Sequence, residues 1–147
     1  MLIYLDNCCF NRPFDDQSQV RILLETEAKL AIQQRIRNGG LQLAWSYMLD
    51  FENGANPYED RRISISTWRN LAVVDVSGSD VILSQARRMR EFGFRDKDAI
   101  HLACAIEAGC SVFLTTDAGI LKKAALISNF AIVNPVDFDF TSSSHDD

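Results

Sequence analysis

Short apolar runs alternate along the chain with longer stretches in which apolar residues recur every three or four positions. The short runs are typical of β-strands buried on both faces, and the longer stretches are typical of amphipathic helices. Five strands are predicted at residues 2–5, 41–45, 72–76, 111–114 and 131–133. Helices are predicted at residues 19–38, 46–51, 59–70, 80–93 and 97–108, with a short helix after the fourth strand.

Capping and breaking residues mark the ends of several predicted helices. Ser46 is a predicted N-cap, and Asp96 is expected to cap the helix that follows it. Asn53-Gly54 is expected to break the helix that begins at Ser46, and Gly109 to close the last long helix. The first helix is expected to begin late, after residues 11–16.

Alternation of strands and helices predicts an α/β fold, a three-layer α/β/α sandwich with a mainly parallel central sheet. One domain is predicted over residues 1–140, followed by a polar tail at residues 141–147. In such folds ligands bind outside the carboxyl ends of the strands. Asp6 follows the first strand and Asp117 follows the fourth, so both are expected at that edge.

Composition narrows the class of protein. The chain has 147 residues, 47% of them hydrophobic and 24% charged, as in a globular protein. A net charge of −5 counts against a DNA-binding repressor but does not exclude a nuclease, whose carboxylates bind metal. No apolar run is long enough for a membrane span and no basic segment precedes the first strand, so a cytoplasmic protein without a signal peptide is expected. The four cysteines have no zinc-site spacing and are expected to be free thiols in a reducing compartment.

Four acidic residues stand out by their positions. Asp6 and Asp117 end strands, Glu52 lies six residues past Ser46 on the helix leaving the second strand, and Asp98 lies in the first turn of the helix before the fourth strand. A carboxylate among apolar residues is costly unless it is paired, and Mg²⁺ is a cation that carboxylate oxygens bind. The alternative is that these acids are helix caps and surface charges.

The same residues resemble the motifs of the PIN-domain family. Residues 2–7 resemble the family's opening strand and aspartate, and residues 46–52 resemble its serine and glutamate motif. Residues 97–103 and 113–117 look very like its third and fourth motifs, which are the specific part of the match. Asn7 departs from the pattern, because serine or threonine is commoner there.

This resemblance implies a metal site and names its residues. It implies that Asp6, Glu52, Asp98 and Asp117 bind Mg²⁺ or Mn²⁺ and are catalytic. Asp50 is an alternative to Glu52, which the spacing from Ser46 favours. Residues implied or expected to support the site are Asn7, Ser46, Thr115 and Thr116, the threonines by positioning water or phosphate.

Several other residues are candidates for secondary roles. Arg12, Arg95 and Lys97 lie close in sequence to the acids and are candidate RNA phosphate contacts. His101, three residues after Asp98, is expected to have a packing or hydrogen-bonding role. Trp68 and Phe94 could stack on bases, but aromatics at helical spacing are more often core residues; their expected place is the core.

The function implied by the resemblance is a metal-dependent ribonuclease, the toxin of a VapBC-type toxin–antitoxin pair. Its expected partners are an RNA substrate and an antitoxin that lies against the helices at residues 19–38 and 59–70; a homodimer using the same apolar surface is the alternative. A catalytically silent PIN domain acting as a binding module is a second possible function. A receiver-like phosphoacceptor domain is a third, disfavoured because Asp6 is followed by Asn7 and no lysine lies beside Val133.

Overall fold

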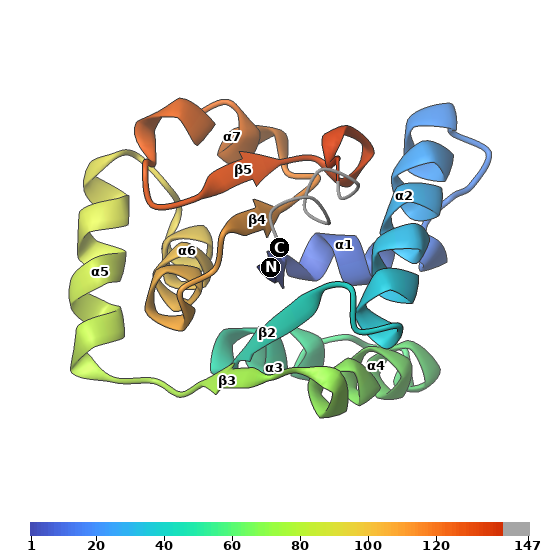
Figure 1. The fold of residues 1–147 in the computed structure, drawn as a ribbon, viewed down its shortest axis with the longest axis horizontal. Helices are drawn as coiled ribbons and strands as arrows, with labels where there is room; N and C mark the ends of the chain where they lie inside the picture. Colours follow the sequence, from blue (N-terminus) through green and yellow to red (C-terminus); the bar gives the residue numbers. More distant parts are fainter. Residues whose placement is uncertain (140–147) are drawn as a thin grey trace.

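The computed structural model describes residues 1–139, and over this range the chain forms an α/β fold around one parallel sheet (Figure 1). The strands lie in the order β3-β2-β1-β4-β5, and each pairs with its neighbours in parallel. Their bounds are β1 (Leu2–Leu5), β2 (Gln42–Ser46), β3 (Val74–Val76), β4 (Val112–Leu114) and β5 (Ala131–Val133). The predicted fold class is confirmed; the predicted tail at residues 141–147 lies outside the described residues.

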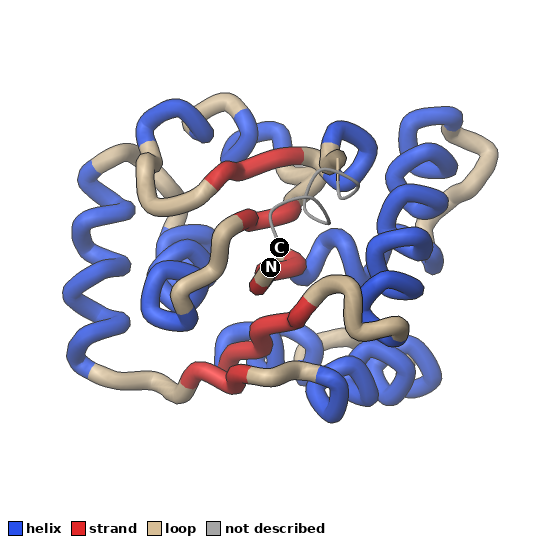
Figure 2. The backbone as a smooth tube through the Cα atoms, viewed as in Figure 1, coloured by secondary structure: helices blue, strands red, loops and turns tan. Residues whose placement is uncertain are grey.

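Helices cover both faces of the sheet. In Figure 1, α5 and α6 lie to the left of the strands, and α1, α2 and α4 lie to the right, which gives the three predicted layers (Figure 2). The helices are α1 (Asn7–Asn11), α2 (Val20–Arg37), α3 (Tyr47–Gly54), α4 (Glu59–Ser66), α5 (Asp80–Glu91), α6 (Asp96–Ala108) and α7 (Ala118–Leu121). Short 3₁₀ turns are η1 (Arg12–Phe14), η2 (Thr67–Leu71), η3 (Ala124–Leu126) and η4 (Pro135–Asp137). Among the described residues, no helix is long and apolar enough to cross a membrane.

Several helix ends follow from single residues. The Ser46 hydroxyl accepts a hydrogen bond from the Leu49 amide at 3.3 Å, which confirms the predicted N-cap of α3. Gly109 ends α6 with a φ of 78°, a left-handed conformation that glycine adopts without strain. Asp96 is not a cap as predicted: it lies in the first turn of α6, and Arg95 is the N-cap residue.

Two predicted helix boundaries were wrong for identifiable reasons. A helix, α1, begins directly after β1, because the Asp6 carboxylate accepts a hydrogen bond from the Asn7 amide and caps it; five residues are too few for a periodic pattern. Helix α3 continues through Asn53 and Gly54. The Asn53 amide donates to the Arg62 carbonyl at 2.8 Å, so this side chain ties α3 to α4.

The predicted inner face of α2 also needs correction. Leu23, Leu24, Ile32 and Ile36 recur at helical spacing in the sequence, which favours a common buried face, but Leu23 and Leu24 are 39% and 48% exposed. The buried positions of this helix include polar side chains instead, namely Glu25, Lys29 and Gln33. Helix α2 therefore places Ile32 and Ile36 in the core but also buries these polar groups, while Leu23 and Leu24 lie on the surface.

The core lies between the sheet and the two helical layers. Phe113 of β4 stacks between Tyr4 of β1 and Phe130, with ring centroids 5.2 and 5.9 Å apart. Trp68 and Phe94 are 6% and 5% exposed, which confirms their expected place in the core.

The order of the strands creates a crevice at one edge of the sheet. The chain leaves β1 toward β2 on one side and later returns to β4 on the other, so the connections diverge beyond the carboxyl ends of β1 and β4. Ligands of open α/β sheets bind at such a switch point. Asp6 directly follows β1 and Asp117 follows β4, so the chain delivers both acids to this crevice.

Candidate metal centre

Asp6 is held in place by both neighbouring strands. Its Oδ1 accepts a hydrogen bond from the Asn7 amide at 2.8 Å, and its Oδ2 accepts one from the Thr115 hydroxyl at 2.8 Å. The residue is 6% exposed. Both of these donors are neutral, so the two hydrogen bonds leave the carboxylate open to a cation.

Glu52 of α3 and His101 of α6 meet Asp6 at the crevice. The His101 Nε2 contacts the Glu52 Oε1 and lies 3.8 Å from the Asp6 Oδ1. One ligand atom from each residue lies within 4.8 Å of the others. His101 is 1% exposed and hydrogen-bonded, as expected, but the position of its ring between two carboxylates was not predicted.

Tyr4 fixes the orientation of the His101 ring. The Tyr4 hydroxyl is 2.6 Å from the His101 Nδ1 and 2.7 Å from the Ser46 Oγ, and all three side chains are buried. With Nδ1 engaged by Tyr4, Nε2 is directed at the carboxylates. Ser46 therefore supports the centre twice, as the cap of α3 and as a partner of Tyr4. Sequence reasoning missed Tyr4, whose only signal is a hydroxyl within an otherwise aliphatic strand.

Asp98 and Asp117 line one cavity of about 250 Å³. The Asp117 Oδ1 caps α7 by accepting hydrogen bonds from the Gly119 and Ile120 amides at 2.7 and 3.2 Å. Its amide donates to the Thr115 Oγ1 at 3.0 Å, and the same hydroxyl donates to Asp6. Thr115 thus links the acids that follow β1 and β4.

The pKa of Asp98 is influenced by the charges of the other three acids. Burial raises the pKa of Asp98 to about 6, and the negative charges of Asp6, Asp117 and Glu52 add to the shift. Protonated His101 acts in the opposite direction. The charges around Asp98 are therefore mostly negative, and His101 offsets them only in part.

Glu52 and His101 shift each other's pKa in opposite directions. Burial alone would raise the pKa of Glu52, but the hydrogen bond and charge of His101, assisted by Lys97, lower it. Burial alone would lower the pKa of His101, but Glu52 and Asp6 raise it. A positive charge on His101 is favourable here, because the ring lies between the carboxylates of Glu52 and Asp6.

The donor set of this region fits a divalent cation. We call the four carboxylates together with His101 the carboxylate centre. Carboxylate oxygens suit Mg²⁺ and Mn²⁺, and an imidazole nitrogen favours Mn²⁺ over Mg²⁺. The Asn7 Oδ1 and Thr116 Oγ1 are buried without a hydrogen-bond partner among the described residues, so two further oxygens remain to be satisfied beside the centre.

Asp50, the alternative to Glu52, has a different environment. Its Oδ1 accepts a hydrogen bond from the Trp45 Nε1 at 2.9 Å and lies 3.4 Å from the Arg69 guanidinium. Glu52, and not Asp50, is therefore the acid of α3 that contacts His101 and lies near Asp6.

Basic residues border the carboxylate centre on one side. Arg95, Lys122 and Lys123 line the cavity that Asp98 and Asp117 share, and the Lys123 Nζ donates to the Gly93 carbonyl at 2.5 Å. The two lysines were missed in the sequence, although they follow Asp117 at the end of a short helix. Arg12 is placed differently. Its guanidinium forms ion pairs with Asp15 and Glu25 at 2.8 and 2.9 Å, so its charge is already balanced by these two acids.

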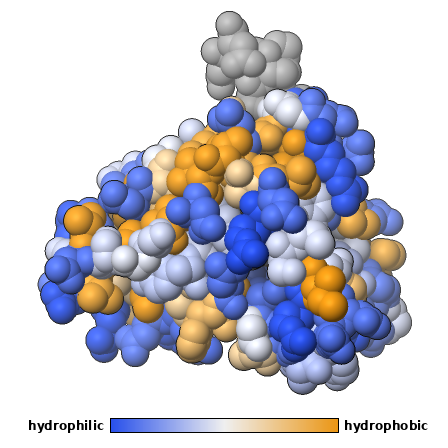
Figure 3. All heavy atoms as spheres, turned by 90° about the horizontal axis from the view of Figure 1, so that it is seen from below, coloured by the Kyte–Doolittle hydropathy of each residue, from blue (hydrophilic) through white to orange (hydrophobic). Residues whose placement is uncertain are grey.

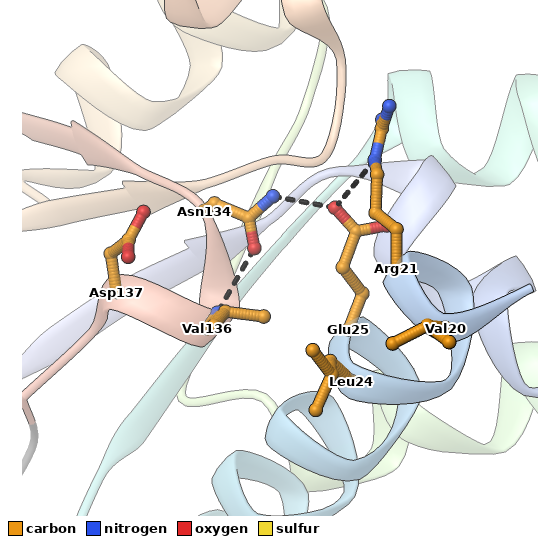
Figure 4. A pocket seen from close by; sticks show the side chains of 7 residues that line it. All are labelled: Val20, Arg21, Leu24, Glu25, Asn134, Val136 and Asp137. Carbon is orange, nitrogen blue, oxygen red and sulfur yellow. Dashed lines mark hydrogen bonds and ion pairs between the residues drawn. The ribbon is translucent and has the colours of Figure 1, made fainter.

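A cavity of about 390 Å³ lies elsewhere, between α2 and η4 (Figure 4). Its buried acid, Glu25, is already paired with Arg12 at 2.9 Å and with the Asn134 amide at 2.6 Å. Arg21 approaches the same carboxylate at 3.5 Å. Because its acid is satisfied by side chains of the protein, this cavity has no chemistry comparable to the carboxylate centre.

Comparison with known proteins establishes the fold. No family model and no curated protein matches the sequence. A chain in the crystal structure of FitAcB from Neisseria gonorrhoeae is similar in structure, with a TM-score of 0.60, 14% sequence identity and coverage of 92% of this chain and 99% of that one. A chain of VapBC2 from Rickettsia felis, solved bound to a DNA fragment from their promoter, gives a TM-score of 0.58 at 10% identity, covering 91% and 98%. These likenesses confirm the fold that the resemblance to PIN domains implied.

Proposed function

We propose that this protein is a metal-dependent ribonuclease that hydrolyses RNA phosphodiester bonds. The observation that carries the proposal is the convergence of Asp6, Glu52 and His101 within 4.8 Å at the switch point of the sheet, with Asp98 and Asp117 in the adjoining cavity. Unneutralised carboxylates at this position are what a phosphodiesterase needs to hold a divalent cation.

Each residue of the centre has a proposed task. Asp6, Glu52, Asp98 and Asp117 would hold Mg²⁺ or Mn²⁺, which activates a water nucleophile and stabilises negative charge on the attacked phosphate. Thr115 orients Asp6 through its hydroxyl, and Ser46 acts through Tyr4. The unpartnered oxygens of Asn7 and Thr116 are available to position water or phosphate.

Basic side chains beside the centre would bind the RNA backbone. Arg95 and Lys122 line the cavity of Asp98 and Asp117, and the charge of Lys97 reaches Glu52. Because the whole chain is acidic, these local cations, rather than the overall field, would bring phosphate to the centre.

We also propose that the protein is the toxin of a toxin–antitoxin pair and acts in the cytoplasm, where its four free cysteines would remain reduced. Both structural neighbours with the same fold come from complexes, one of them named VapBC2. An antitoxin would place a basic side chain among the carboxylates and an apolar segment on the surface of α2 and α4. A homodimer through this surface is the alternative.

Metal removal tests the enzymatic part. Protein dialysed against EDTA is incubated with a fluorescently end-labelled RNA, before and after addition of Mg²⁺ or Mn²⁺. We expect no cleavage in EDTA and cleavage after either ion is restored. Full cleavage in EDTA would refute the metal mechanism; binding of Mn²⁺ without cleavage of any RNA tested would favour the catalytically silent binding module.

A further inference from the structure

Lys29 of α2 is buried without an anionic partner. It is 4% exposed, and its Nζ lies 5.5 Å from the centroid of the Phe10 ring and 6.0 Å from that of Trp68. Among the described residues, no carboxylate lies within ion-pair distance of this ammonium. Lysines are almost never buried unless they are paired, because an unpaired buried charge is costly; packing alone does not account for this position.

A second buried donor lies one helical turn further along α2. Gln33 is 4% exposed, and its Nε2 has no hydrogen-bond partner among the described residues. Residues four apart on a helix share a face, so the amide of Gln33 and the ammonium of Lys29 are neighbours. Arg37 follows after another turn, with its guanidinium 4.7 Å from the Trp68 ring.

These donors border a cavity of about 200 Å³ between α2, α4 and the turns η1 and η2. Its other walls include the side chains of Phe10, Phe14, Ile65 and Trp68. No acidic side chain lines it. We call Lys29, Gln33 and these walls the donor pocket: it offers hydrogen-bond donors and a positive charge, and none of its lining residues carries a carboxylate.

A carboxylate matches the donor pocket better than a phosphate does. Its two oxygens accept from two donors, and its single negative charge balances the single buried ammonium of Lys29. A phosphate brings about one further half to full charge at neutral pH, and the second cation of the cavity, Arg37, is exposed and lies over the Trp68 ring, so it would balance that charge only at the rim. Leu30, 49% exposed, extends the walls of the cavity to the surface, so the occupant also carries apolar groups.

We propose that the donor pocket receives the carboxylate of a glutamate or aspartate side chain within an apolar segment of a protein partner. Figure 3 shows patches of apolar residues among charged ones on the face formed by α4 and β3. Such patches favour binding of a peptide with apolar side chains over binding of an isolated small acid. The inference rests on the proposed partner, and it adds the residue type by which the partner is anchored.

The test is binding of a matched pair of peptides, followed by nuclear magnetic resonance of the complete protein. The probes are acetyl-Leu-Ala-Glu-Ala-Leu-amide and the same peptide with glutamine in place of glutamate. We expect saturable shifts of the Trp68 indole signal with the glutamate peptide and at least tenfold weaker binding of the glutamine peptide. Equal affinity of the two peptides, or no saturable shift with either, would overturn the proposal.

Two variants and a free acid complete the design. Lys29→Met should remove the preference for glutamate, whereas Arg88→Met, which removes an exposed charge of α5, should leave it unchanged. Preference that survives Lys29→Met refutes the role of Lys29. Propionate tests the other source of a carboxylate: if it binds as tightly as the glutamate peptide, the site is for a small acid and the partner is refuted.

The titration of Lys29 gives a second readout. Burial, with Arg37 adding and Cys9 opposing, lowers the pKa of Lys29 to about 8; the residues that line the pocket from η1, α4 and η2 carry no charge. A bound glutamate should return this pKa toward its ordinary value. The peptide-binding assay contains neither RNA nor divalent metal. A negative result in this assay would therefore not refute the nuclease proposal, and absence of RNA cleavage would not refute carboxylate binding in the donor pocket.

Discussion

The carboxylate centre and the donor pocket are two buried regions with charge of opposite sign. In the centre, acids from four elements of the chain converge, and one imidazole partly balances them. In the donor pocket, the charged and amide groups all come from α2, and the walls that face them are aromatic and aliphatic side chains with one serine. A fold selected only for stability would replace such groups by apolar ones, so both regions are best explained by what they bind.

Their free-energy penalties are relieved at opposite ends of the pH scale. Asp98, with its pKa raised to about 6, loses its unfavourable charge as the pH falls. Lys29, with its pKa lowered to about 8, loses its unfavourable charge as the pH rises. A divalent cation should therefore stabilise the carboxylate centre, and an anion should stabilise the donor pocket.

The largest effect is expected for Asp6→Asn. The amide keeps the size of the side chain but removes the charge that lies 3.8 Å from the His101 Nε2 and is linked to Thr115. We expect RNA cleavage to fall by about 10³-fold with Mg²⁺ or Mn²⁺. The control is Asp60→Asn, an exposed acid in the first turn of α4, which should cleave at the rate of the unmodified protein. Comparable losses in both variants would show that the effect is not specific to the centre.

A change of about 3 kcal/mol in stability is expected for Lys29→Met. The unfolded chain holds the lysine proton up to pH 10.5, whereas the folded protein releases it near pH 8. Between these values the unfolded state binds more protons, so the free energy of unfolding rises with pH, and below pH 8 the full penalty remains. Urea unfolding at pH 7 should therefore find Lys29→Met more stable than the unmodified protein, with the difference closing toward pH 10.5. A variant that is less stable at pH 7 would mean that the ammonium is satisfied in the folded protein.

A loss of 10- to 100-fold in Mn²⁺ affinity is expected for His101→Asn, about 1.4–2.7 kcal/mol. The reason is that Tyr4 directs the His101 Nε2 at Glu52 and Asp6, where it is placed to act as a ligand. Electron spin-echo measurements on the Mn²⁺-loaded protein should show ¹⁴N coupling that is absent in the variant. Tyr4→Phe should retain the coupling with a smaller loss of affinity. Absence of ¹⁴N coupling in the unmodified protein would restrict His101 to positioning Glu52.

The sequence predicted one of these two regions and missed the other. The strands and the acids Asp6 and Asp117 follow from apolar runs that end in an acid, and Glu52 follows from its spacing to Ser46, whereas the order of the strands in the sheet was not predicted. These signals are local, because the ends of parallel strands share an edge whatever the rest of the chain does.

Contacts between distant segments left no such signal. The position of His101 between two acids depends on a tyrosine 97 residues away in sequence, which fixes its ring. Burial of Lys29 depends on η1, α4 and η2 covering the polar side of α2, while Leu23 and Leu24 remain on the surface. Helical periodicity identified α2 and agrees with the burial of Ile32 and Ile36, but it fails for Leu23 and Leu24, because it assumes that all apolar residues point inward.

The smallest effect, about 1 kcal/mol, is expected for Asp98→Asn in metal-free protein. The folded pKa of about 6 lies above the unfolded value of 3.8, so between these values the folded state binds more protons and the free energy of unfolding rises as the pH falls. Above pH 6 the full penalty remains; it is modest because Asp98 is only half-buried and solvent screens its repulsion from Asp6, Asp117 and Glu52. In EDTA at pH 7.5, Asp98→Asn should therefore unfold at a higher urea concentration than the unmodified protein, and the two should converge near pH 4. Asp96→Asn, which removes the exposed partner of Arg90, should not show this convergence. Saturating Mn²⁺ should reverse the order at pH 7.5, because the cation stabilises the charged carboxylate; a variant that remains the more stable one with Mn²⁺ bound would exclude Asp98 from the metal site.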